Sequence, residues 1–128
     1  MSSGRRAIHL AGIGHGPGRP AGSRIGNIVV SASLVGRSPE SGELSTDPAE
    51  QIKDLFSTMV RFLEAADVTV DDVIRVNVTL SKPEYREFLN VEWAKYFNDE
   101  ESLPTRKATI SALPGAIVAE LELMAVAT

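Results

Sequence analysis

Three charged residues in the last quarter of the chain are the first candidates for chemistry. Arg106 opens a β-type segment that ends at a Leu-Pro-Gly turn, residues 113–115. Glu120 and Glu122 lie within the apolar run that follows. A charge in an apolar strand is costly to bury unless it is paired or has a ligand. The guanidinium of an arginine is a planar donor fork that fits a carboxylate. The alternative is a structural ion pair, for example Glu120 with Arg106 or Arg24 of another subunit.

The composition is that of an ordinary globular chain. Its 128 residues are enough for one domain with a core, and we expect a single domain over residues 1–128. The net charge of −4 gives no electrostatic reason to expect a nucleic acid or a membrane as partner. The absence of cysteine excludes disulfides, thiolate catalysis and cysteine-based metal sites. The start, MSSGRR, is basic without a long apolar segment behind it, so we expect no signal peptide and a cytoplasmic location.

Hydrophobic periodicity and turn residues divide the chain into strands and helices. Asp47, Pro48 and Glu50 form a helix start: the aspartate caps, the proline takes the first helical position, and the glutamate reaches back to the cap amide. This helix is expected to end near Ala66. A second capping box at residues 81–84 opens another helix. Five segments have the pattern of strands: residues 7–10, 27–34, 73–80, 106–112 and 117–126.

These elements predict an α+β fold. Residues 11–23 are rich in glycine and proline and are expected to form a loop. Two amphipathic helices with one apolar face each must cover one face of a mixed sheet, which gives a two-layer sandwich. The last strand is apolar on both faces apart from its two glutamates. We therefore expect the uncovered face of the sheet to be buried against another subunit.

Short motifs along most of the chain resemble one known family. Residues 26–31, 41–44 and 67–78 are similar to its Gly-Asn strand start, its Ser-Gly turn and its Asp-Asp-Val-Val-Lys-x-x-Val run. Residues 88–97, with Asn90, are similar to its helix Phe-x-x-Val-Asn-x-x-Tyr-x-x-Phe. Residues 104–106, 113–114 and 120–125 resemble its Pro-x-Arg, Leu-Pro and Glu-Ile-Glu-Ala-Ile-Ala. By this order and spacing the chain resembles the RidA/YjgF family of 2-imino acid deaminases, also known as L-PSP endoribonucleases.

The resemblance implies a chorismate-mutase-like fold, with a mixed six-stranded sheet and two helices on one face. It implies a homotrimer with three clefts between subunits, each lined by the family's arginine and glutamate. It implies no cofactor and no metal. On this basis Arg106 and Glu120 are the expected catalytic residues, and the expected partner is a small substrate whose carboxylate Arg106 binds.

The chain departs from the family pattern where the family pocket closes. The family's Gly-Pro-Tyr-Ser-Gln is here Gly-Pro-Gly-Arg-Pro, residues 16–20, with one extra residue before Gly26, so the tyrosine is absent. The pocket serine aligns with Ala32, and Ser31 or Ser33 is its possible replacement. The segment after Arg106 is one residue shorter than the family's. We expect a wider pocket and a shifted substrate, or a loss of hydrolysis.

Several residues are candidates whose structural roles compete with ligand binding. Asn90 can bond a loop backbone or a ligand, and the structural role is favoured. Glu122 shares a strand face with Glu120 by alternation and is also favoured as structural. Trp93 is assigned to the helix core. His15 could replace the missing tyrosine, although a lone loop histidine is more often a bystander. The expected substrate-binding residues are Arg106, Ser31, Ala32, Ser33, Asn90, His15 and Arg19.

The leading hypothesis is hydrolysis of a 2-imino acid or enamine to a 2-oxo acid and ammonium. Arg106 would hold the carboxylate, Glu120 would position the attacking water, and backbone groups of residues 31–34 would complete the pocket. One alternative is a catalytically silent trimer that binds a small carboxylate. Another is an enzyme of the same fold that acts on a bulkier imine or enamine in a catabolic or biosynthetic pathway. Ribonuclease activity has little support in an acidic chain without a basic patch.

Overall fold

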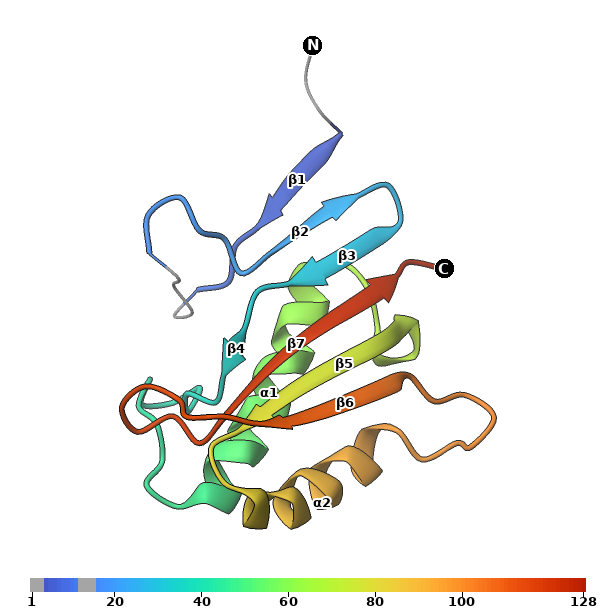
Figure 1. Ribbon diagram of the computed structural model, residues 1–128. Coiled ribbons are helices and arrows are strands. Elements are labelled where there is room, and N and C mark those ends of the chain that lie inside the picture. The colour runs from blue at the N-terminus through green and yellow to red at the C-terminus, as the bar shows by residue number, and fades with distance from the viewer. Residues whose placement is uncertain (1–3, 12–15) are drawn as a thin grey trace.

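The computed structural model describes residues 4–11 and 16–128, which form one mixed sheet and two helices (Figure 1). The helices are α1 (Pro48–Ala65) and α2 (Arg86–Tyr96), and short 3-10 turns precede β5 and α2. The strands are β1 (Arg5–Ile8), β2 (Gly22–Ile25), β3 (Ile28–Ser31), β4 (Leu34–Val35), β5 (Val73–Leu80), β6 (Thr105–Ile110) and β7 (Ala119–Val126).

The sheet is built around β7. Six strands follow the order β1-β2-β3-β7-β5-β6, and β4 pairs with β7 beside this path. The β5–β6 pair is parallel, and the other pairs are antiparallel. Strands β1 and β6 are therefore the two edges of the sheet. The connection from β5 through α2 to β6 is a crossover, which parallel neighbours require.

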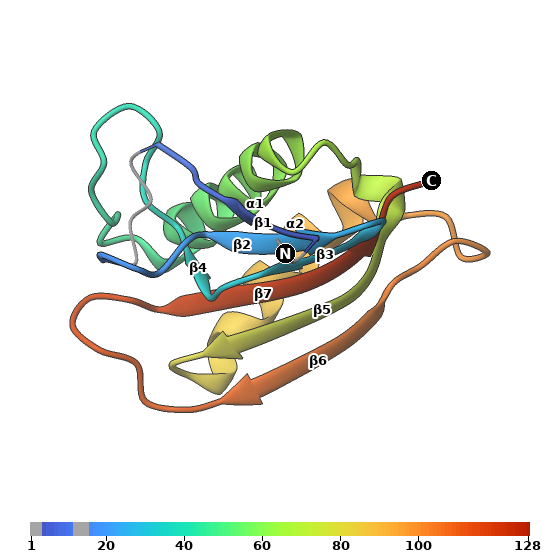
Figure 2. The same ribbon diagram turned by 90° about the horizontal axis from the view of Figure 1, so that it is seen from above.

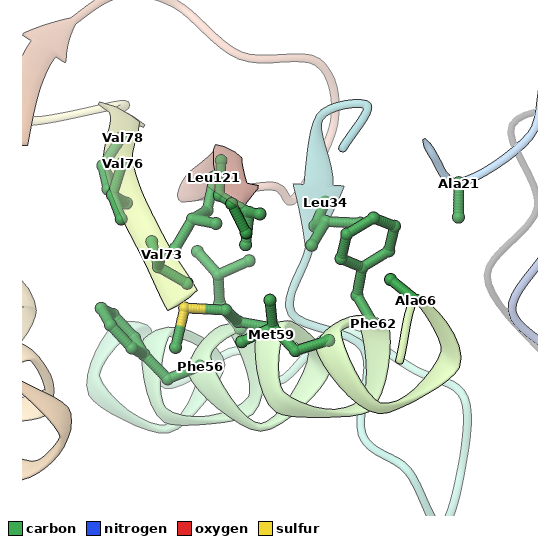
Figure 3. Packing of buried hydrophobic residues seen from close by; sticks show 14 of the residues in the cluster. Ala21, Leu34, Phe56, Met59, Phe62, Ala66, Val73, Val76, Val78 and Leu121 are labelled. Carbon is green, nitrogen blue, oxygen red and sulfur yellow. The ribbon is translucent and has the colours of Figure 1, made fainter. Parts of the chain in front are cut away.

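Helix α1 forms because its start is capped and one of its faces is apolar. The Asp47 carboxylate accepts a hydrogen bond from the Ala49 N–H at 3.1 Å, and Pro48 opens the helix. The expected bond from Glu50 to the cap amide is replaced, since the Asp47 N–H donates to Ser45 Oγ at 3.1 Å. Figure 3 shows side chains of the sheet, such as Leu34 and Val76, pointing toward α1. The helical residues that are buried there include Ile52, Leu55, Phe56, Met59, Phe62 and Leu63.

A buried glutamine joins α1 to the start of β7. Gln51 is 1% exposed. Its Nε2 donates to the carbonyl oxygens of Ser45 and Ala116, both at 3.0 Å. Its Oε1 accepts from the Val118 N–H at 2.8 Å. One side chain thus satisfies three backbone groups from segments before α1 and before β7, which fixes the loop that leads into the strand carrying Glu120.

Helix α2 begins differently from the prediction. Residues Pro83–Tyr85 form a 3-10 turn, α2 starts at Arg86, and neither start has a side-chain cap bond. The Ser81 N–H donates to the Val118 carbonyl oxygen, so residue 81 continues the sheet and does not form a capping box. The predicted capping box is therefore wrong, although the helix exists. Tyr96 on α2 stacks on Phe56 of α1 with ring centroids 5.6 Å apart, which places both helices in one layer.

The predicted α+β sandwich is confirmed. Strand β5 has its predicted bounds, and α1 ends where it was expected to end. The sheet has seven strands, one more than expected, because the short β4 pairs with β7. Strand β2 was not predicted: its first two residues belong to the segment 11–23 that the composition assigned to a loop, and Gly26, with φ +55°, turns it into β3.

One face of the sheet is covered by the helices and the other is open (Figures 1 and 2). Register partners on the open face are Ile28 with Val126 and Val30 with Met124. Ile28 is 50% exposed and Val30 is 42% exposed. The open face therefore has an apolar end over β3 and β7. None of the described helices is long and apolar enough to cross a membrane.

We predict that Gln51→Leu lowers the free energy of unfolding by about 1–3 kcal/mol, because it removes the partner of three backbone groups in partly buried hydrogen bonds. Urea unfolding of both proteins at one fixed protein concentration measures this difference. The control is Lys53→Leu, an exposed position on the same helix, where we expect a change within about 0.5 kcal/mol. Equal urea midpoints for Gln51→Leu and the unchanged protein would contradict the role given to Gln51.

Candidate functional site

Arg106 lies on the edge strand β6 with its side chain toward the helix layer. Its register partner on β5 is Val76, which is fully buried in the core. Side chains of paired residues share a face of the sheet. Arg106 Nη2 donates to Asn90 Oδ1 at 2.7 Å. Arg106 Cζ lies 5.2 Å from the ring centroid of Trp93, within the range of a cation–π interaction. Two side chains of α2 thus hold the guanidinium.

The guanidinium of Arg106 is held in place, but its positive charge is not neutralised. In the part of the chain that the structure describes, no carboxylate forms an ion pair with it. Burial lowers the pKa of Arg106, and the nearby charge of Arg86 lowers this pKa further. Both causes disfavour the charged form, so an anion at this place would stabilise the guanidinium. Asn90 accepts a hydrogen bond but carries no charge, and it therefore leaves Arg106 available to an anion.

Trp93 has a second role besides packing. Its ring is half-buried and lies against Phe97, with centroids 4.5 Å apart. The assignment of Trp93 to the helix core is therefore incomplete, since the same ring also contacts Arg106. An aromatic face beneath a guanidinium restricts where that group can move. We call Arg106, Asn90 and Trp93 the α2/β6 half-site.

Glu120 and Glu122 lie on the opposite, open face of the sheet. Their register partners on β5 are Thr79 and Asn77, which alternate with the buried core residues of that strand. The expectation that both glutamates share one strand face is confirmed. Glu120 is half-buried, and within the described residues it has no ion-pair partner. Within its own chain Arg24 donates to the carbonyl oxygens of Gly26 and Ala66, and an ion pair of Glu120 with Arg24 of another subunit stays a prediction.

The open face has a hollow of about 260 Å³ beside Glu122. Asn77 Nδ2 donates to Glu122 Oε1 at 3.2 Å, and Arg75 Nε donates to Asn77 Oδ1 at 3.4 Å. Ser31 also lines the hollow, and its Oγ accepts from the Leu123 N–H at 2.9 Å. The hydroxyl hydrogen of Ser31 remains available to a ligand. We call Ser31, Glu120 and Glu122 the open-face half-site.

Ala32, Ser33 and Arg19, the other expected pocket residues that the structure describes, lie near β2, β3 and β4, away from the edge strand β6 that carries Arg106. The Ala32 N–H donates to the Ala21 carbonyl oxygen at 2.7 Å, so this backbone donor is already used. Ser33 is half-buried between β3 and β4. Arg19 is exposed in the turn before β2, where its backbone N–H donates to the Gly16 carbonyl oxygen. His15, which could replace the family tyrosine, lies outside the described residues.

A single chain does not bring the two half-sites together. Arg106 faces the helices from one edge of the sheet, whereas Glu120 projects from the other face of the central strand. Asn90 is the one expected pocket residue that contacts Arg106 within the described residues. No group of three or more histidine, aspartate or glutamate side chains suited to a metal ion occurs in residues 4–11 and 16–128. The arrangement places a guanidinium without an ion-pair partner among the described residues on one face and a carboxylate on the other.

Sequence reasoning missed Arg86 and Asn77. Arg86 stands four residues before Asn90 on α2, a spacing that puts both on one helix face. That signal was present, but it acquires meaning only once Asn90 is known to contact Arg106. Asn77 is one of several polar residues on β5, and its contact with Glu122 follows from the register of two strands far apart in the sequence.

Comparisons with known proteins agree on the family and the fold. A family model described as Endoribonuclease L-PSP matches residues 20–127. A RutC family protein of Pyrococcus abyssi is 32% identical over 80% of each chain. A 2-iminobutanoate/2-iminopropanoate deaminase of Escherichia coli is 23% identical over 82% of this chain and 84% of its own.

Solved structures of similar shape cover nearly the whole chain. The YjgF gene product of E. coli superposes with a TM-score of 0.82 at 22% identity, over 94% of this chain and 98% of its own. A putative endoribonuclease of Thermotoga maritima superposes with a TM-score of 0.85 at 24% identity, over 96% of this chain and 98% of its own. These likenesses show the fold.

We predict that Asn90→Asp weakens anion binding at Arg106 without unfolding the protein. The new carboxylate would form an ion pair with Arg106 at the place where the neutral amide now accepts a hydrogen bond, and it would compete with a carboxylate ligand. Calorimetric titration with 2-oxobutyrate should show an affinity lower by about tenfold or more. The control is Asn98→Asp, which makes the same charge change at an exposed position after α2. Unchanged affinity in Asn90→Asp would mean that the ligand does not bind at Arg106.

Proposed function

Since the chain belongs to the Endoribonuclease L-PSP family, which is the RidA/YjgF family, we propose that it is a deaminase of 2-imino acids. It adds water across the C=N bond of the imine, or of the tautomeric enamine, and releases a 2-oxo acid and ammonium. The likeness to the E. coli deaminase supports this reaction class at 23% identity. The two relatives at 32% identity are named only as RutC family proteins.

The observation that carries the proposal is the state of Arg106. Its guanidinium is fixed by Asn90 and Trp93 and is partly withdrawn from water, yet no carboxylate of the described residues pairs with it. Partial burial of a charge without a neutralising partner is costly, and a bound carboxylate would offset this cost. The free edge of the guanidinium can donate two parallel hydrogen bonds to the carboxylate of the substrate, and this fixes the position of the adjacent imine carbon.

Glu120 is the proposed group that positions the water. Its carboxylate accepts one proton from the water as the oxygen attacks the imine carbon and passes it to the nitrogen, which gives a carbinolamine. The second proton of the former water follows the same route to the nitrogen as the C=O bond forms and the C–N bond breaks. The carbon thereby gains an oxygen and the nitrogen leaves as ammonia, which is protonated in solution. A half-buried glutamate without an ion-pair partner among the described residues is suited to this exchange, since no fixed cation holds its charge.

The proposed assembly is a homotrimer in which these groups meet across subunits. Within one chain the α2/β6 half-site and the open-face half-site lie on opposite faces of the sheet. Ile28 and Val30 expose apolar surface on the open face, and a second subunit that covers this face would remove that surface from water. A second copy that covers this face could bring its own α2/β6 edge to Glu120. A trimer would thus explain both the exposed apolar surface and the separation of the two half-sites within one chain.

The pocket segments favour a bulkier substrate than 2-iminopropionate. Ala32 stands where the family has its pocket serine, and the family tyrosine is absent from residues 16–20. The same departures also support the second candidate, a carboxylate-binding trimer without catalysis. The Ala32 N–H is bonded to Ala21, so neither the side chain nor this backbone donor can hold a water or substrate in place of the serine.

We predict that the protein accelerates the decay of imino acids generated by an amino-acid oxidase, and that the acceleration is greater for the imine of leucine than for 2-iminopropionate. Arg106→Ala should remove the acceleration, since the loss of a charge-assisted bidentate contact costs on the order of 2–5 kcal/mol in a desolvated site. The matched control is Arg37→Ala, because Arg37 is exposed and its guanidinium donates to the carbonyl oxygen of Gly42 in a turn.

Three outcomes separate the hypotheses. Acceleration that survives in Arg106→Ala would contradict the proposed role of this arginine. Fast decay of 2-iminopropionate, equal to that of larger imines, would contradict the shifted pocket. No acceleration of any imine by the unchanged protein, together with retained binding of 2-oxobutyrate, would reject the deaminase and support the silent carboxylate-binding trimer.

A further inference from the structure

A second arginine lies next to the α2/β6 half-site. Arg86, Asn90 and Trp93 follow one another on α2 at spacings of four and three residues, so they share one face of the helix. Asn90 and Trp93 both contact Arg106, and the charge of Arg86 acts on Arg106. The guanidinium of Arg86 on this helix face and that of Arg106 on β6 therefore lie along the same edge of the sheet.

Arg86 and Arg106 are offset along the direction of β6 and α2. Helix α2 runs antiparallel to β6 (Figure 1), so the start of the helix lies beside the end of the strand. Arg86 precedes Asn90 by one helical turn, about 6 Å along the axis. On β6 the next residues that share the face of Arg106 are Ala108 and Ile110. The side chains beside the path from Arg106 toward Arg86 are therefore small or apolar.

Neither cation is neutralised by a described carboxylate. Glu92, the buried acidic residue of α2, is bonded to Lys95 at 2.8 Å. No carboxylate within the described residues forms an ion pair with Arg86 or Arg106. Two like charges near each other raise the free energy of the site when it is partly desolvated. A ligand with two negative groups would relieve this repulsion more fully than a ligand with one.

Arg86 is a feature of this chain and not of the family pattern quoted in the sequence analysis. When that pattern is aligned on Asn90, its first phenylalanine, four residues before the asparagine, falls on Arg86, two residues before the matched range 88–97. The change replaces an apolar ring by a cation at the rim of the proposed substrate site. It is thus a candidate for a residue that determines which imino acid is accepted.

We propose that the site selects a substrate with a second acidic group. Arg106 binds the carboxylate next to the imine, and Arg86 binds a carboxylate at the far end of the side chain, with the methylene groups over Ala108. In an extended five-carbon dicarboxylic acid the two carboxyl carbons are about 5 Å apart, comparable to the one-turn offset between the anchors. The substrate class is the imine of an acidic amino acid. This inference rests on the carboxylate-binding role proposed for Arg106.

The test compares two ligands of equal chain length by isothermal titration calorimetry. 2-Oxoglutarate has two carboxylates, and 2-oxopentanoate has the same five carbons with one. We expect the unchanged protein to bind 2-oxoglutarate at least about tenfold more tightly. Arg86→Gln should remove this preference and leave 2-oxopentanoate binding within about twofold. Arg86→Lys should retain part of the preference, since the charge remains without the planar fork.

The control is Lys53→Gln, which removes one positive charge from α1 and should leave the preference intact. Because Arg86 is exposed, its variants are expected to fold, and circular dichroism checks this. Equal binding of the two acids by the unchanged protein, or equal weakening of both by Arg86→Gln, would overturn the inference about Arg86 and leave the deaminase proposal in place. Binding of neither acid by the unchanged protein would overturn both.

Discussion

The alternation of side chains along neighbouring strands is the constraint on which the functional account depends. Register links Arg106 to Val76 on the helix side of the sheet, and it links Glu120 to Thr79 on the open side. A slip of one residue in either strand would turn these side chains to the other face. Such a slip is unfavourable because it would also turn the buried apolar side chains of β5 and β7 out of the core. The fold therefore places the guanidinium of Arg106 and the carboxylate of Glu120 on opposite faces of the sheet of one chain.

The proposed anion site at Arg106 stays open to a ligand because the groups that hold this guanidinium are uncharged. An amide oxygen and an indole ring fix the guanidinium without neutralising it. A carboxylate in place of Asn90 would give a stable ion pair and a site closed to anions. The cost is a cation that is partly desolvated beside another cation. Such a local conflict with the rules of stability is typical of a functional site, and an anionic ligand resolves it.

The sequence predicted the elements whose signals are local. The Asp47-Pro48 start and the helical period set the bounds of α1, and strict alternation set those of β5. Strand β2 was missed because its identity comes from pairing with β1 and β3, while its own composition is that of a loop. The capping box at residue 81 was wrong for a similar reason, since a strand partner, Val118, takes the amide of Ser81. Tertiary pairing overrode the local pattern in both cases.

The motif that includes Arg106 was recognisable in the sequence, but the face on which it lies was not. That face follows from the parallel pairing of β5 with β6, which local periodicity does not reveal. The contact with Asn90 joins residues from two elements, and the importance of Arg86 follows from that contact. Sequence reasoning thus identified the chemical groups, whereas their separation into two half-sites required the register of the sheet.

Subunit complementation tests the divided site most directly. Arg106→Ala and Glu120→Gln each damage a different half-site and should each be inactive as pure proteins. If the site forms between subunits, mixed trimers assembled from equal amounts of both variants contain some clefts with an intact arginine from one chain and an intact glutamate from the other. Random assembly then restores about a quarter of the imine hydrolysis of the unchanged protein. Mixtures that remain as inactive as the two parents, although exchange of subunits is verified, would contradict a site shared between chains.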